Sequence, residues 1–133
     1  MELDCFGLSG VSTLSAKVVQ FSQNSVSSVF SDGSKFSGLT NALRNSPDYY
    51  MSVEPVRVIR FQDLPTNVQQ RLASQGANRY GIYSIDNRRL LAARDAKTRI
   101  NVTYVKPGDI PNVNLSRQFS TVNGGKRPKV RCR

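Results

Sequence analysis

The residues best suited to chemistry lie in one short stretch, "YSIDNRRLLAARDAKTR" (83–99). Asp86 falls where a helix N-cap belongs, and its carboxylate can accept a bond from an N–H of the first helical turn. Arg88 and Arg89 follow in that turn, where each cation opposes the helix dipole by roughly 0.3–1 kcal/mol. A bound anion would remove this conflict, because N–H groups and guanidinium forks would converge on it. We predict a phosphate site here; the alternative is that Asp86 only caps the helix and the arginines are solvated.

A second candidate segment is "RQFSTVNGGK" (117–126). Ser120 and Thr121 offer hydroxyls to phosphate oxygens, and the two glycines that follow permit close backbone approach. Lys126 adds positive charge. The alternative interpretation is a hairpin with ordinary turn residues.

The charge of the chain points to a polyanionic partner. Its 133 residues carry 19 Lys and Arg against 9 Asp and Glu, a formal net charge of +10. Residues 1–53 hold three bases and four acids (net −1), whereas residues 54–133 hold sixteen bases and five acids (net +11). Such an excess favours nucleic acid or an anionic membrane surface. No apolar run is long enough to span a bilayer, so we expect no stable membrane insertion.

The absence of histidine narrows the chemistry. It excludes histidine–metal nucleases and RNases that use paired histidines, and the nine acids show no spacing typical of a metal-binding carboxylate cluster. Cys5 and Cys132, near the two ends, are either bonded to each other or free thiols. We therefore expect no metal and no cofactor. Metal-free RNA cleavage fits, because RNA carries its own nucleophile, the 2′-OH, and the protein has to align it, stabilise the transition state and move two protons.

The candidate site follows from these points. We predict as catalytic residues Asp86, Arg88, Arg89, Ser120 and Thr121. Because arginine stays protonated throughout the usual pH range, it is a poor base, and Asp86, a perturbed Lys97 or Lys126, or a tyrosine would have to move protons. As RNA-binding residues we predict Arg94, Lys97, Arg117, Lys126, Lys129 and Arg131. The five tyrosines could stack on bases, but we interpret most of them as strand packing.

Hydrophobic periodicity and turn residues predict one small α+β domain with a twisted, mostly antiparallel sheet and two or three helices. We expect a flexible segment over 1–17 and the folded domain over 18–133. The expected strands are 54–61, 79–85 and 99–105, the expected helices are 37–47, 63–76 and 87–96, and the tail 117–133 reads as a hairpin with a Gly–Gly turn.

Four phrases in order resemble the C-terminal toxin domains of polymorphic bacterial toxins of the contact-dependent inhibition and Rhs types. Those domains often carry a "PIRV"-like strand, a phrase like "YSLDNRRL" and, much later, "FTTxNxG". This chain has "VQFSQNSVSSVFSDG" at 19–33, similar to the family's entry segment, then "PVRVIRF" at 55–61, "YSIDNRRL" at 83–90 and "FSTVNGG" at 119–125. The resemblance covers roughly residues 18–131.

The resemblance implies a ribonuclease-toxin-like fold and a ribonuclease that cleaves RNA, tRNA above all, in competing bacteria. The domain would be the tip of a larger protein, secreted or displayed at the cell surface, and would act in the target-cell cytoplasm. Its implied partners are a cognate immunity protein, expected to be acidic, and a host factor in the target cell.

Two alternatives stay open. "DNRRLLAA" (86–93) also resembles the Gly-Glu-Arg-Arg-x-x-Ala-Ala pattern of ParB-like domains, without the glycine; this predicts a nucleotide- or DNA-binding module without RNase activity. A basic structural or ribosome-associated protein is the other, and the net charge of −1 in the first 53 residues disfavours it.

Overall fold

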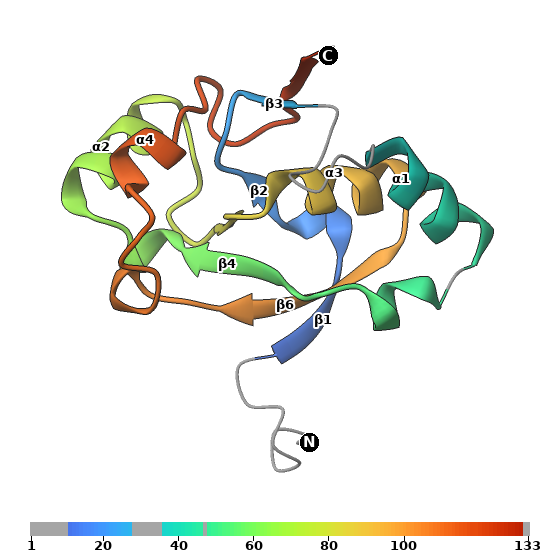
Figure 1. Ribbon diagram of the computed structural model, residues 1–133. Coiled ribbons are helices and arrows are strands. Elements are labelled where there is room, and N and C mark those ends of the chain that lie inside the picture. The colour runs from blue at the N-terminus through green and yellow to red at the C-terminus, as the bar shows by residue number, and fades with distance from the viewer. Residues whose placement is uncertain (1–10, 28–35, 47, 132–133) are drawn as a thin grey trace.

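A mixed five-stranded sheet forms the centre of the molecule, in the order β1-β6-β4-β5-β2, and a two-stranded sheet β3-β7 lies beside it (Figure 1). The computed structural model describes residues 11–27, 36–46 and 48–131. The strands are β1 (Val11–Ser15), β2 (Gln20–Phe21), β3 (Ser25–Ser27), β4 (Val56–Arg60), β5 (Ile82–Ser84), β6 (Arg99–Tyr104) and β7 (Lys129–Arg131). The α+β class is therefore confirmed.

The prediction of a mostly antiparallel sheet is wrong. In the main sheet β1 pairs with β6 and β4 with β5 in antiparallel fashion, but β4–β6 and β2–β5 are parallel. The parallel β4–β6 pair is possible because α2, β5 and α3 lie between the two strands in the chain. Parallel neighbours require such a long connection. Sequence periodicity carries no information on this choice.

Four α-helices are described: α1 (Phe36–Asn45), α2 (Thr66–Ser74), α3 (Asn87–Ala96) and α4 (Leu115–Gln118). The expected bounds of α3 are confirmed, and Lys97, directly after the helix, adopts the left-handed conformation (φ 59°) of a helix C-cap. Helices α1 and α3 pack together over one face of the sheet. Helices α2 and α4 contact each other and lie at the end of the sheet away from α1 (Figure 1).

Alternate residues of the central strands face two separate hydrophobic clusters. Val56 and Val58 of β4 are buried with the apolar side of α3, for example Leu90. Ile59, which follows Val58 and points to the opposite face of the sheet, is buried with Tyr83 and with side chains of α2. The sheet thus carries apolar groups on both faces.

The two ends of the chain depart from expectation. The predicted hairpin over 117–133 is wrong: residues 115–118 form α4, and β7 pairs in parallel with β3. Gly124 and Gly125 do adopt positive φ (76° and 98°), but within an irregular loop. In the segment expected to be flexible, residues 11–15 instead form β1. Cys5 and Cys132 lie outside the described residues.

Candidate functional site

The junction between β5 and α3 turns at Asp86, and the expected cap bond is wrong: the Asp86 carboxylate accepts no backbone N–H of the described first turn of α3. Its carboxylate turns instead to β4. Oδ2 accepts bonds from the backbone N–H (2.8 Å) and Nε (3.1 Å) of Arg57, and Oδ1 accepts one from Nη2 (2.8 Å). Three bonds, two of them from a guanidinium fork, stabilise the carboxylate more than a single N-cap bond does.

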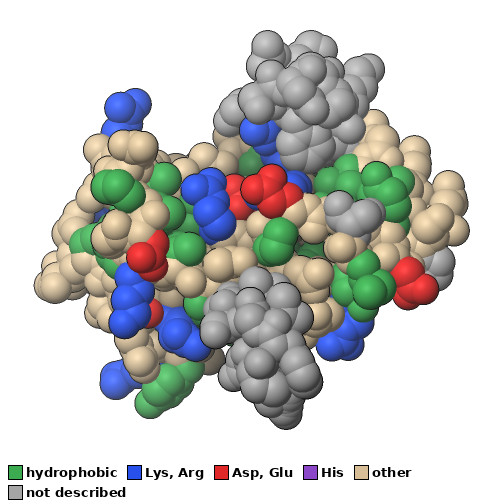
Figure 2. All heavy atoms as spheres, turned by 60° about the horizontal axis from the view of Figure 1, so that its bottom comes forward, with side chains coloured by type: hydrophobic (Ala, Val, Ile, Leu, Met, Phe, Trp, Pro, Cys, Tyr) green, Lys and Arg blue, Asp and Glu red, His purple; other side chains and the backbone are tan. Residues whose placement is uncertain are grey.

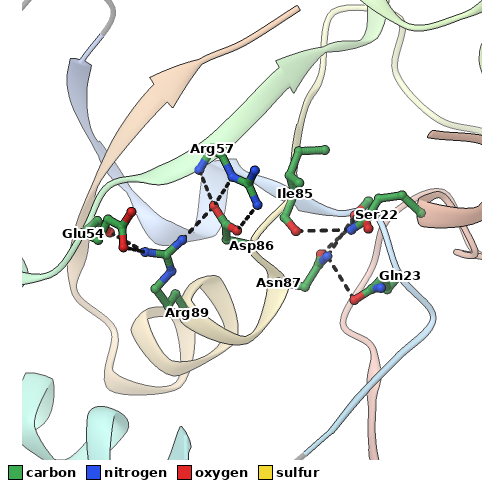
Figure 3. Close-up of polar contacts among 9 residues, drawn as sticks. Ser22, Gln23, Glu54, Arg57, Ile85, Asp86, Asn87 and Arg89 are labelled. Atoms are coloured by element: carbon green, nitrogen blue, oxygen red, sulfur yellow. Dashed lines mark hydrogen bonds and ion pairs between the residues drawn. The ribbon is translucent and has the colours of Figure 1, made fainter. Parts of the chain in front are cut away.

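A second arginine completes a charge cluster made of Glu54, Arg57, Asp86 and Arg89 (Figure 3). Nη2 of Arg89 lies 2.8 Å from Oδ2 of Asp86, while Nη1 lies 3.4 Å from Oε1 of Glu54 and donates to its backbone carbonyl at 3.1 Å. Two guanidinium groups are therefore fixed on one carboxylate. Because two acids balance them, the cluster has no net charge.

Protonation of the cluster follows from these contacts. Burial alone would raise the pKa of Asp86, whose side chain is 12% exposed, but the bonds from Arg57 and the charge of Arg89 outweigh it and lower that pKa below its ordinary value. The bond to Asp86 in turn raises the pKa of Arg57. An ionised carboxylate with a lowered pKa is a weak base. In this arrangement Asp86 positions the two arginines.

On the other side of the start of α3, Ser22, Gln23 and Asn87 contact one another (Figure 3). Together with Gln118, which also bonds to Ser22, they form an amide cluster. Asn87 is buried; its Oδ1 accepts from the Ser22 N–H (2.9 Å) and its Nδ2 donates to the Ser22 hydroxyl (2.8 Å). Nε2 of Gln118 donates to the same hydroxyl (3.0 Å) and to the Ile85 carbonyl (3.2 Å). These bonds fix the segment after β2 to the junction.

The Ser120–Thr121 segment is joined to the amide cluster through Ser22. The Thr121 N–H donates to the carbonyl of Ser22 (3.0 Å), and Asn24 donates its N–H to the Ser120 hydroxyl (3.1 Å). Ser120 is exposed, and because its oxygen accepts that bond its own proton is available to a ligand. Thr121 is buried, and its hydroxyl accepts from the N–H of Gly125 (2.9 Å), so in this structure it organises the loop.

The predicted RNA-binding residues do not form one patch. Arg94 is half-buried: its guanidinium lies 4.8 Å from the centre of the Phe21 ring and donates to the carbonyl of Val19, and burial lowers its pKa. This side chain holds α3 against β2. Lys97 is exposed at the far end of α3 from Asp86, roughly 16 Å away at the helical rise of about 1.5 Å per residue.

The other predicted cations are spread over the tail. Arg117, Lys126 and Lys129 are exposed, on α4, the loop and β7 respectively; Arg88 is half-buried in the first turn of α3, and the side chain of Arg131 is not among those described. Figure 2 shows one face, on which Lys and Arg side chains stand in separate groups, several beside acidic ones. The basic side chains on that face therefore do not form one continuous positive patch.

Sequence reasoning missed Arg57, Ser22 and Asn87. Arg57 alternates with valines in "PVRV", which predicts only that it leaves the sheet on the opposite face from them. Its partner Asp86 is 29 residues away, and no local pattern pairs them. Asn87 offered one signal: an amide between an acid and two arginines at a helix start.

Comparisons with known proteins add no assignment: no family model, curated protein or solved structure matches the chain. Within residues 11–27, 36–46 and 48–131 there is no group of three or more His, Cys, Asp or Glu side chains arranged to hold a metal ion. No described helix is long and apolar enough to cross a membrane.

Proposed function

We propose that this chain is a metal-independent ribonuclease toxin domain that cleaves RNA, tRNA in the first instance, in competing bacteria. The observation that carries the proposal is the pair of guanidinium groups of Arg57 and Arg89, which Asp86 holds together at the β5–α3 junction. A pair of rigid forks on two different elements suits the oxygens of a phosphodiester.

In this proposal the RNA supplies the 2′-OH nucleophile and the arginines stabilise the charge that develops on the phosphate. Nε and Nη2 of Arg57 bond to Asp86, and its side chain is 43% exposed, so Nη1 is the nitrogen that these bonds leave for a ligand. The phosphate would displace Glu54, whose side chain is 84% exposed, from Arg89. Proton transfer falls to a group other than Asp86, and the exposed hydroxyl of Ser120, in the segment joined to the junction through Ser22, could donate a hydrogen bond to the phosphate.

The partners follow from the charge. A chain of net charge +10 binds RNA phosphates with a strong salt dependence and is complementary to an acidic immunity protein. We further propose that the domain is carried by a larger secreted or surface-displayed protein and acts in the target-cell cytoplasm, where a host factor assists it.

A second candidate is a ParB-like module that binds a nucleotide or DNA without cleaving RNA. One observation favours it: the contacts that lower the pKa of Asp86 remove the one acid at the junction from base catalysis. The two functions differ in whether a product forms.

The test is a cleavage assay on purified bacterial tRNA in the presence of EDTA, with and without clarified bacterial lysate as a source of host factor. Arg57→Lys keeps the positive charge beside Asp86 but loses the fork, and should lower the cleavage rate roughly 100- to 1000-fold. Arg99→Ala, an exposed arginine on β6, is the matched control and should cleave like the wild type. Binding without any product supports the second candidate, and equal losses in both variants would overturn the site.

A further inference from the structure

A groove opens at the start of β5, at the opposite end of that strand from the charge cluster. Its volume of about 570 Å³ lies within the range of small-ligand sites. Its described lining is aromatic, apolar and amide-bearing, and contains one lysine and no Asp or Glu. The residues that carry the inference are Gln20, Asn78, Tyr80, Tyr104, Asn123 and Lys126.

Tyr80 is the unusual member of this lining, because 75% of it is exposed. Its backbone is nevertheless fixed: its N–H donates to Oδ1 of Asn78 (2.8 Å), the N–H of Gly81 donates to the carbonyl of Asn78 (3.0 Å), and Phe61 donates its N–H to the carbonyl of Gly81 (3.0 Å). A large ring held in water on an ordered turn adds little to packing. It is a ready platform for a flat aromatic ligand.

Tyr104 is a half-buried part of the same lining, where β6 ends. The guanidinium carbon of Arg60 lies 4.2 Å from the centre of its ring, a cation–π contact that orders both side chains. The groove therefore has an aromatic floor with a positive charge beside it.

Among the described residues that line the groove no acid balances its positive charge, in contrast to the charge cluster. Lys126 is exposed at its rim, and its N–H donates to Oδ1 of Asn123 (3.0 Å), which fixes the loop that carries it. Aromatic rings, amide groups and a cation without a neighbouring acid in the lining are the groups that recognise an unpaired base and its phosphate.

We propose that this groove binds an unpaired nucleobase of single-stranded RNA, with the base stacked on Tyr80 and the adjoining phosphate on Lys126. The inference deepens the proposed function by naming a substrate subsite, and it rests on that function for the identity of the polymer. The loop 119–126 runs from the amide cluster, through Thr121, to the groove, through Gly124 and Lys126. A strand bound along this loop would reach both the groove and the arginines.

The test is fluorescence anisotropy with a labelled ten-nucleotide oligouridine whose riboses are 2′-O-methylated, so that it cannot be cleaved through the 2′-OH. A ribose-phosphate chain of the same length without bases is the comparison. Wild-type protein should bind the base-containing strand roughly 5- to 100-fold more tightly. Tyr80→Ala should abolish the difference, Tyr80→Phe should keep it, and Tyr49→Ala, a tyrosine outside the groove, should also keep it.

Folding is not at issue for Tyr80→Ala, because the ring is mostly exposed, and circular dichroism checks this. Lys126→Ala should weaken both ligands alike and reduce the slope of log affinity against log salt by about 0.7. Equal binding of the two strands by the wild type, or equal losses for Tyr80→Ala and Tyr49→Ala, would overturn the groove. If the groove behaves as expected and tRNA is not cleaved, the ribonuclease proposal fails and the groove stands.

Discussion

Replacing Asp86 by Asn tests whether one carboxylate holds the two arginines together. The carboxylate receives three bonds from Arg57 and one contact from Arg89, and its side chain is 12% exposed. A carboxamide keeps one acceptor oxygen and turns an NH₂ group toward a guanidinium. Each hydrogen bond to a charged group contributes about 1.5–3 kcal/mol. Because the Arg57 side chain is 43% exposed, solvent screening reduces the sum; we expect a net loss of about 2 kcal/mol in the free energy of unfolding at pH 7.

The same variant should change the acid sensitivity of the fold. The folded-state pKa of Asp86 lies below its ordinary value of about 3.9, so the unfolded state takes up the proton first. The stabilisation is therefore complete above about pH 5 and is lost as the pH falls below about 4 toward the folded-state pKa. In Asp86→Asn this part of the acid dependence disappears, and the unfolding curves of variant and wild type should converge at low pH.

Thermal unfolding followed by circular dichroism between pH 3 and pH 8 is the assay. At pH 7 a loss of about 2 kcal/mol corresponds to a midpoint roughly 6–12 °C lower for a chain of this size. Asp109→Asn, a carboxylate that accepts the N–H of Lys106 at an exposed turn, is the control and should shift the midpoint much less. A midpoint for Asp86→Asn within about 1 °C of the control, with an unchanged pH dependence, would refute the role given to this carboxylate.

Two further predictions concern the segments that hold the site. Gly125→Ala should destabilise the fold by about 3 kcal/mol or more, because Gly125 has φ +98° and a Cβ there would lie 2.8 Å from the Tyr83 ring. Gly38→Ala, in α1 with open space around the position, should instead stabilise the fold by about 0.5–1 kcal/mol. Chemical denaturation measures both changes. Asn87→Ala should cost about 2–3 kcal/mol because it leaves the N–H of Ser22 without its buried acceptor; a denaturation midpoint equal to the wild type would contradict the positioning role of this amide.

The local elements could be predicted from the sequence because their signals are local. Helix α3 begins after an acid and is rich in Ala and Leu, and β4 alternates valine with arginine, so both lie where the pattern placed them. The tail could not be predicted in this way. Its Gly–Gly pair is typical of a hairpin, but the N–H of Gly125 bonds to Thr121 within the loop, and β7 pairs with β3 about a hundred residues earlier.

Most of the side chains in the candidate site could be named from the sequence, but their contacts could not. The sequence put Asp86 and Arg89 at one junction and offered the Ser120 segment as a second candidate; in the structure Ser22 bonds both to Asn87 of the junction and to Thr121 of that segment. It could not show that Asp86 turns to Arg57 rather than to its own helix, because that choice depends on which strand lies beside β5. Nor could the sequence show that Tyr80 is exposed on its turn whereas Tyr83, three residues later, is buried.

The pairing of early with late strands affects when the domain can fold. Thr13 of β1 meets Asn101 of β6, 88 residues along the chain, and β3 waits for residues 129–131. Contacts of such large sequence separation form slowly, since loop-closure entropy is lost before they are made. During synthesis the five-stranded sheet cannot be completed until Tyr104 has left the ribosome, and the two-stranded sheet cannot be completed until Arg131 has done so. We expect the growing polypeptide to stay protease-sensitive until that moment, which limited proteolysis of ribosome-stalled chains of increasing length would detect.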